Sequence, residues 1–121
     1  MKKTTYLFTI LSLTIFSCSN NSEDDLIDTT PIPEGQKVTY NADIKSIMDN
    51  NCTFCHNNPP VNGAPTSLVT YQDVSSQANS ILNRISLQAG EGGAMPLGGP
   101  RLPQTSIDLF QQWINDGLLE D

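Results

Sequence analysis

The pentapeptide Cys52-Thr53-Phe54-Cys55-His56 places two thiols three positions apart, with an imidazole directly after the second. A dithiol redox pair uses this cysteine spacing, but it accompanies a βαβ pattern, and the chain has no convincing alternating strand. A structural zinc site needs four ligands, whereas His56 is the single histidine and Cys18 is the one remaining cysteine. The other two interpretations are a chance occurrence and a cofactor attachment site.

Cys-x-x-Cys-His is a signature of covalent haem attachment. The motif resembles that of c-type cytochromes, in which both thiols form thioether bonds to the haem vinyl groups and the adjacent histidine binds the iron. By this resemblance, Cys52 and Cys55 hold one covalent haem c, and His56 is an iron ligand. An iron-bound histidine usually donates its second ring N–H to a backbone carbonyl, and the proline-rich loop near Pro65 is the candidate source.

The sixth iron ligand is predicted to be Met95. This residue lies in the segment Gly-Gly-Ala-Met-Pro-Leu-Gly-Gly, residues 92–99, whose glycines permit a close approach of the backbone to a porphyrin face. The segment resembles the Met-Pro loop of class I cytochromes c, where the thioether sulfur binds iron. The alternative is a loop methionine in irregular packing. Met48 precedes Cys52 by one helical turn and is predicted to pack in the core. A His/Met pair raises the reduction potential and leaves no position for a substrate.

Residues 1–17 match a bacterial lipoprotein signal peptide. Lys2 and Lys3 precede the apolar residues 6–16, a pattern of secretory signals that is too short for a permanent membrane span. Residues 15–18 resemble a lipobox, which implies lipidation of Cys18; the alternative is an ordinary signal peptide with an incidental cysteine. Residues 18–37 would then be the lipidated cysteine and a flexible acidic tether. We therefore expect an exported protein, lipid-anchored at the periplasmic membrane face or the cell surface.

Helix signals precede and follow the pentapeptide. Asn41 is a candidate N-cap for a helix that continues to about residue 51, with Ile44, Ile47 and Met48 as its apolar stripe. Residues 57–67 contain three prolines and a glycine and should form a loop. A second, single amphipathic helix is predicted from the spacing of its apolar residues. They are Val74, Ala78, Ile81, Leu82 and Ile85.

The last helix is predicted to begin with a capping-box-like pair, Thr105 and Asp108. Its buried face would consist of Ile107, Phe110, Trp113 and Ile114. Gly117 is a natural residue to follow the helix, with Leu118 folding back as its hydrophobic contact. Trp113 has two interpretations, a core residue or a donor to a haem propionate.

The predicted fold class is all-α, with a cytochrome c-like haem domain over residues 38–119 and a C-terminal tail at 120–121. The arrangement resembles the class I cytochrome c fold, in which the first and last helices cross beside the haem. It is most similar to short single-haem bacterial domains that carry Tyr-x-x-Asp-Ile and Trp-Ile-x-x-Gly, here residues 40–44 and 113–117. Leu68 and Tyr71 could line the haem pocket or the core. Arg84 and Arg101 could pair with propionates or remain on the surface.

Composition limits the partners. Six basic and thirteen acidic residues give a formal net charge of −7, which argues against nucleic-acid binding because phosphate contacts need clustered Lys and Arg. Redox proteins are the expected partners, and a basic docking face would suit the charge. The expected function is electron transfer without enzymatic activity. The alternatives are a haem-bearing interaction subunit of a larger respiratory or dehydrogenase complex, and a haem protein that binds peroxide or gas when Met95 leaves the iron.

Overall fold

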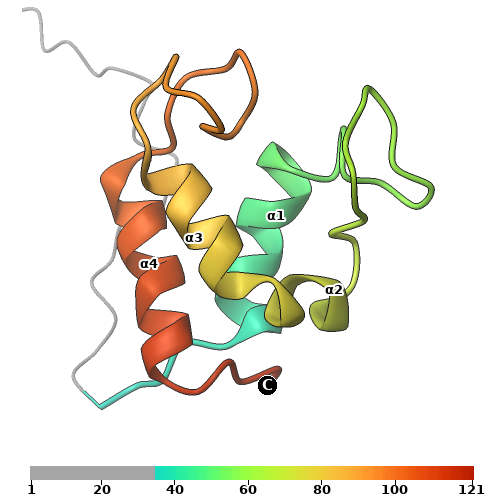
Figure 1. Cartoon of the computed structure of the whole chain (residues 1–121). Helices are drawn as coiled ribbons and strands as arrows, with labels where there is room; N and C mark the ends of the chain where they lie inside the picture. Colours follow the sequence, from blue (N-terminus) through green and yellow to red (C-terminus); the bar gives the residue numbers. More distant parts are fainter. Residues whose placement is uncertain (1–34) are drawn as a thin grey trace, which may run out of the picture.

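The computed structural model describes residues 35–121 of the chain. This part is all-α and contains no strand. Its elements are the π-helical turn η1 (Tyr40–Ile44), α1 (Lys45–Asn51), α2 (Tyr71–Ser76), α3 (Ala78–Ser86) and α4 (Gln104–Asn115). In Figure 1 the loops that follow α1 and α3 extend from one end of the molecule, and the C-terminus lies at the other. The predicted signal peptide, Cys18 and most of the tether lie outside the described residues.

The first helix begins two residues earlier than predicted. Thr39, and not Asn41, is the N-cap: its Oγ1 accepts a hydrogen bond from the Ala42 N–H at 3.4 Å. The Asp43 carboxylate in turn accepts from the Thr39 N–H at 2.8 Å. Two reciprocal bonds outweigh the single cap that Asn41 would supply, because helix starts leave several N–H groups without partners. Of the predicted apolar stripe, Ile44 and Met48 are buried, and Ile47 is partly buried against the core.

The second predicted helix is in fact two, α2 and α3, which meet at Gln77. A capping box starts α2, in which Thr70 Oγ1 accepts from the Asp73 N–H at 3.1 Å and the Asp73 carboxylate accepts from the Thr70 N–H at 3.2 Å. These bonds from Thr70 hold the pKa of Asp73 below its ordinary value. Gln77 leaves helical geometry, with φ −116° and ψ 8°. The residues that share a face remain buried on both sides of this break, which is why periodicity alone did not reveal it.

The last helix, α4, starts at Gln104. Thr105 therefore lies inside the first turn and makes no cap, contrary to the prediction; instead the carbonyl of Pro103 accepts from the Ser106 and Ile107 N–H groups at 3.0 and 3.3 Å. The predicted end is confirmed. Gly117 has φ +99°, and the Leu118 N–H reaches back to the Trp113 carbonyl at 2.9 Å, as in a Schellman motif.

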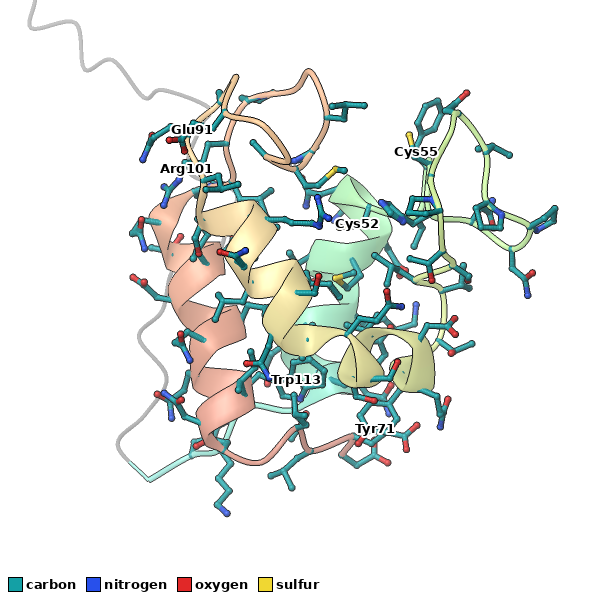
Figure 2. All side chains as sticks on the ribbon, viewed as in Figure 1. Cys52, Cys55, Tyr71, Glu91, Arg101 and Trp113 are labelled. Atoms are coloured by element: carbon teal, nitrogen blue, oxygen red, sulfur yellow. The ribbon has the colours of Figure 1, made fainter. Side chains whose placement is uncertain are left out.

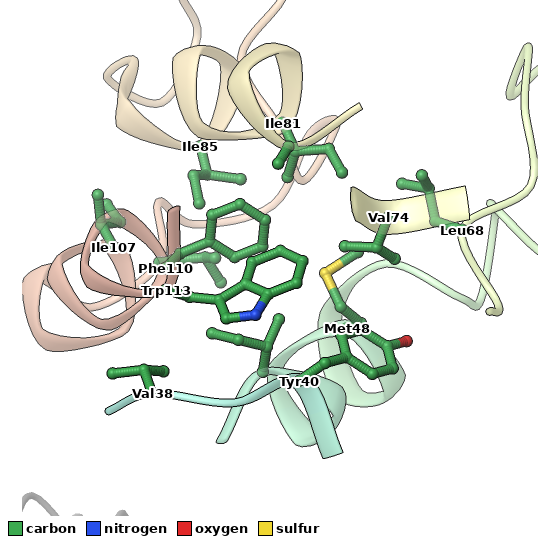
Figure 3. Close-up of a cluster of buried hydrophobic side chains, with 13 residues drawn as sticks. Val38, Tyr40, Met48, Leu68, Val74, Ile81, Ile85, Ile107, Phe110 and Trp113 are labelled. Carbon is green, nitrogen blue, oxygen red and sulfur yellow. The ribbon is translucent and has the colours of Figure 1, made fainter. Parts of the chain in front are cut away.

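The core lies where α4 packs against η1 and α3. Figure 3 shows Phe110 and Trp113 at its centre, and the Trp113 ring has centroid distances of 5.8 Å from Tyr40 and 5.4 Å from Phe110. The Trp113 indole N–H donates to the Leu119 carbonyl at 2.8 Å. Trp113 thus has the core role that sequence offered as one of two interpretations. Met48 is buried beside it, as predicted.

The C-terminal residues close the fold by crossing the start of η1. The Leu119 carbonyl accepts from the Tyr40 N–H at 2.9 Å, and the Glu120 carbonyl accepts from the Asn41 N–H at 3.0 Å. The Tyr71 hydroxyl donates to the Leu118 carbonyl at 2.7 Å. Residues 118–121, which we name the C-terminal strap, therefore join η1 and α2 to the end of α4. Among residues 35–121, no helix has the length and apolar character needed to cross a bilayer.

Candidate cofactor site

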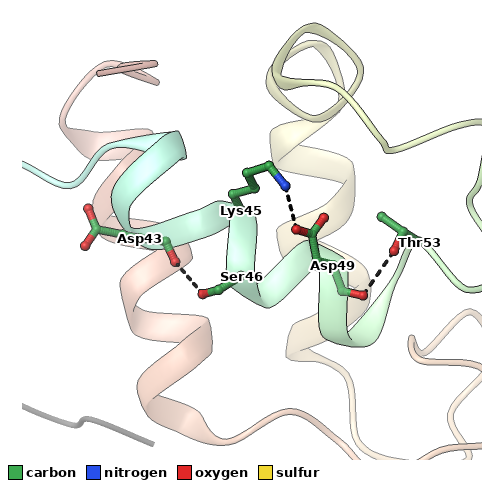
Figure 4. A network of polar contacts seen from close by, with 5 residues as sticks. All are labelled: Asp43, Lys45, Ser46, Asp49 and Thr53. Carbon is green, nitrogen blue, oxygen red and sulfur yellow. Dashed lines mark hydrogen bonds and ion pairs between the residues drawn. The ribbon is translucent and has the colours of Figure 1, made fainter.

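The two cysteines and the histidine lie in one turn that continues from the end of α1. The Cys52 N–H donates to the Met48 carbonyl at 2.9 Å. The Thr53 hydroxyl then donates to the Asp49 carbonyl at 3.0 Å (Figure 4). The Cys52 carbonyl accepts from the N–H groups of both Cys55 and His56, at 3.2 and 2.9 Å. This local winding gathers both thiols and the imidazole within a few residues of one helix end.

The same part of α1 carries a surface ion pair. Lys45 Nζ lies 2.6 Å from an Asp49 carboxylate oxygen, one helical turn away (Figure 4). The carboxylate of Asp49 raises the pKa of Lys45. Both side chains are about half exposed, so this pair adds little to stability. The charged side chains of α1 are therefore exposed to solvent, whereas Cys52 packs partly against the core.

The Cys52 thiol has the wrong properties for a redox nucleophile. Cys52 and Cys55 are free thiols, and Cys52 packs partly against the hydrophobic core. Burial raises the pKa of the Cys52 thiol to about 11, whereas reactive cysteines have a lowered pKa. Its position at the C-terminal, negative end of a helix also disfavours a thiolate. A half-buried neutral sulfur in apolar surroundings is well suited to a thioether.

His56 is oriented by a backbone carbonyl. Its Nδ1 lies 2.8 Å from the Thr66 carbonyl oxygen. Because a carbonyl only accepts hydrogen bonds, Nδ1 must carry the ring proton in the neutral tautomer, and Nε2 keeps a free lone pair. The His56 carbonyl accepts in return from the Leu68 N–H at 2.9 Å. The sequence correctly assigned this role to the proline-rich loop, but the carbonyl belongs to Thr66 and not to Pro65.

Thr66 is itself fixed by the break between α2 and α3. The Gln77 side chain donates from Nε2 to Thr66 Oγ1 at 3.2 Å and to the Asp73 carbonyl at 3.1 Å. Gln77 thereby links the loop that orients His56 to the helices beneath it. Sequence analysis indicated the loop near Pro65 but not Thr66 itself, and it missed Gln77, because no local pattern shows which side chain fixes the loop.

Met95 lies in the loop between α3 and α4. Its side chain is half-buried and packs against the core, and its N–H donates to the Arg84 carbonyl at 3.2 Å. The preceding Ala94 is buried, and the Met95–Pro96 peptide bond is cis. The loop with Met95 and the turn with Cys52 extend from the same end of the helices (Figures 1 and 2). The structure thus brings the two predicted ligand segments to one end of the molecule.

The other candidate residues make contacts within the protein. Leu68 is buried, and Tyr71 is half-buried with its hydroxyl on the C-terminal strap. The Arg84 guanidinium donates to the Gly93 carbonyl at 3.2 Å. Arg101 donates to the Ser86 carbonyl at 3.3 Å and to the Gln104 side chain at 2.9 Å. Both arginines therefore fasten the loop between α3 and α4.

Two large apolar side chains are exposed in the same two segments. Phe54, inside the pentapeptide, is 81% exposed, and Leu97, two residues after Met95, is 80% exposed. The sequence around them is uncharged, since residues 50–72 and 92–100 contain no Asp, Glu, Lys or Arg. These two segments are therefore uncharged, although the chain as a whole is acidic.

Within residues 35–121, no three His, Cys, Asp or Glu side chains are grouped so that they could hold a metal ion by themselves. The donors present are two thiols, one imidazole nitrogen and one thioether, which fit a haem attached through its periphery and ligated at its iron. Comparison of the chain with protein-family models, with curated proteins and with solved structures found no match.

Proposed function

We propose that this chain is a single-haem c-type cytochrome that transfers electrons and is not an enzyme. The observation that carries the proposal is the orientation of His56, whose Nδ1 is engaged by the Thr66 carbonyl at 2.8 Å, which leaves Nε2 with its lone pair. His56 shares one turn with Cys52 and Cys55, neither of which is in a disulfide. A histidine that ligates a metal needs such an arrangement, because the bond at one nitrogen sets the tautomer and aims the other.

In this proposal each residue has a separate task. Cys52 and Cys55 would hold one haem c covalently, and His56 and Met95 would be the ligands of its iron. The haem provides a one-electron Fe(III)/Fe(II) couple when bound. The burial of Cys52 keeps water and charge away from the attachment point, and the Met95 sulfur raises the reduction potential relative to a second nitrogen ligand. If His56 and Met95 both ligate the iron, no coordination site would remain for a substrate.

The proposed fold is the class I cytochrome c arrangement. Its support is the contact of η1, at the start of the helix that carries the motif, with α4, the last helix of the chain. A second support is the position of the Met95 loop immediately before α4. A domain of this size has a small core, and a buried haem attached at two points would enlarge and cross-link it.

We propose that the domain is exported, anchored to a membrane through a lipid on Cys18, and docks with other redox proteins. The net charge of −7 favours approach to a basic partner over long distances. Contact itself would occur at the two uncharged segments, where Phe54 and Leu97 are exposed. The lipid anchor and export rest on the sequence pattern of residues 1–18.

The test is to co-express the full chain with a cytochrome c maturation system and to assay covalent haem by acid-acetone extraction and pyridine haemochrome spectra. The wild type should retain one haem per chain, and the double variant Cys52→Ser/Cys55→Ser should retain none. Cys18→Ser is the matched control, because it removes a cysteine and the lipid but should leave the haem. Met95→Ala should keep the covalent haem and lose the near-infrared sulfur-to-iron charge-transfer band. A wild-type chain that carries no pigment after extraction would refute the proposal.

A further inference from the structure

Arg84 holds the Met95 loop at two points. Its backbone carbonyl accepts from the Met95 N–H at 3.2 Å. Its guanidinium Nη1 donates to the Gly93 carbonyl, also at 3.2 Å. One residue in the last turn of α3 thus bonds to the residue two positions before Met95 and to Met95 itself.

These contacts also complete the end of α3. The last carbonyls of a helix have no partner within the helix. Here the loop supplies donors to two of these carbonyls. The Met95 N–H donates to the Arg84 carbonyl, and the Arg101 side chain donates to the Ser86 carbonyl. A cation near a helix C-terminus is favoured by the helix dipole. The bond between the Met95 N–H and the Arg84 carbonyl restricts the position of the Met95 backbone, whereas the Arg101 bonds fasten the loop near the start of α4.

Gly93 shows how closely the Arg84 side chain approaches. Gly93 has φ +90°, and a Cβ placed on it would lie 3.2 Å from Arg84 Nη1. The guanidinium thus occupies the space that a side chain at position 93 would need. The glycines around Met95 allow the loop many backbone conformations. A fixed contact two residues before the methionine excludes some of the conformations in which the Met95 sulfur is too far from the iron to bind it.

We propose that Arg84 is a positioning residue that keeps the Met95 sulfur available as the axial ligand. This inference rests on the proposed function and assigns to Arg84 a role different from pairing with a haem propionate. Arg84 does not touch the iron; it acts through Gly93 and Met95. Loss of its guanidinium bond should weaken Met95 ligation while the covalent haem and His56 ligation persist.

The test uses the haem-loaded full chain and the near-infrared sulfur-to-iron band of the ferric protein, followed as the pH is raised until Met95 is displaced. Arg84→Leu removes all donors and keeps an apolar stem in the helix. Since a hydrogen bond from a charged donor is lost, Met95 ligation should weaken about tenfold, and the midpoint of band loss should fall by about one pH unit. Arg84→Lys, which keeps a charged donor, should recover part of this loss.

The matched control is Arg101→Leu, because Arg101 fastens the same loop at Ser86 and Gln104 but contacts neither Gly93 nor Met95. Its band should have the wild-type midpoint. Amide hydrogen exchange of Met95 in the ferrous, haem-loaded chain gives a second readout, which should be faster in Arg84→Leu and unchanged in Arg101→Leu.

Three results would overturn the inference. They are an unchanged midpoint in Arg84→Leu, an equal fall in Arg101→Leu, and a changed reduction potential in Arg84→Leu with the band and the Met95 exchange rate unmoved. The last result would indicate a propionate partner. A wild-type chain without covalent haem would instead contradict the proposed function itself, whereas a normal wild-type band with an unmoved variant would contradict only the role of Arg84.

Discussion

Removal of the C-terminal strap, residues 118–121, should destabilise the domain severely. Two carbonyls of the strap accept side-chain hydrogen bonds. The Leu119 carbonyl accepts from the Trp113 indole N–H at 2.8 Å, and the Leu118 carbonyl accepts from the Tyr71 hydroxyl at 2.7 Å. The Leu119 carbonyl also accepts from the Tyr40 N–H at the start of η1. Trp113 is fully buried, so the truncation removes the acceptor of its N–H together with Leu118, which packs against the core.

The magnitude follows from these bonds. A buried donor left without a partner costs about 1–3 kcal/mol, and each of the two partly exposed bonds contributes about 1 kcal/mol. The expected loss in the free energy of unfolding is therefore about 3–5 kcal/mol. A domain of this size has a total of about 4–13 kcal/mol. Truncation after Gly117 should thus leave the domain marginally folded or unfolded.

The assay is urea unfolding of the purified domain, followed by far-ultraviolet circular dichroism and by the fluorescence of Trp113, the single tryptophan. A chain that lacks only residues 120–121 is the matched control. It loses the two bonds that Glu120 and Asp121 accept from the exposed Asn41, which together should cost about 1 kcal/mol or less. Equal stability of the two truncated chains would refute the argument that the buried Trp113 bond dominates.

Two further predictions concern the site. In the haem-free chain, the pKa of Cys52 is about 11, against an ordinary value of 9.0. Alkylation of this thiol at pH 8 should therefore be about 100-fold slower than in the urea-unfolded chain. The rates are measured by mass spectrometry of the labelled peptide, and equal rates would show that the thiol is accessible and ionised in the folded chain. The folded state keeps this proton while the unfolded state loses it. The contribution of this thiol to stability should therefore be constant below pH 9 and fall by up to about 1.4 kcal/mol per pH unit toward pH 11, and Cys52→Ala should lack this contribution to the slope. Gly93→Ala should lower the free energy of unfolding by about 1–2 kcal/mol, because alanine is strained at φ +90° and would crowd Arg84. Gly92→Ala, with open space around it, should be close to neutral, and similar thermal unfolding of the two variants would contradict the strain at Gly93.

Much of the fold could be predicted because burial follows a simple period in this chain. The spacing of Ile107, Phe110 and Trp113 indicates one buried helix face, and all three are buried. Helix boundaries were less predictable. The start at Thr39 depends on a reciprocal bond with Asp43, and the break at Gln77 leaves the buried face unchanged. Such events alter the backbone over one or two residues without altering the hydrophobic pattern.

For the candidate site too, some features could be predicted from the sequence and others could not. The pentapeptide at residues 52–56 indicates its chemistry from spacing alone, since thiols and imidazole so close in the chain are brought together by any compact turn. The carbonyl that orients His56 comes from Thr66, within the segment that the sequence indicated. Arg84 on Gly93 was not foreseen, because the sequence offered a propionate or solvent as its partner.

By itself, the sequence indicated the all-α class, the apolar faces of the helices and the residues that we propose attach and ligate a haem. These properties depend on composition and on neighbours within a few residues. Only the tertiary structure decided that Thr66 orients His56, that Arg84 fastens the Met95 loop, and that residues 118–121 close the core over Trp113. Each of these is a directional hydrogen bond, which forms only when the folded chain brings donor and acceptor within about 3 Å, and hydrophobic periodicity carries no information on that distance.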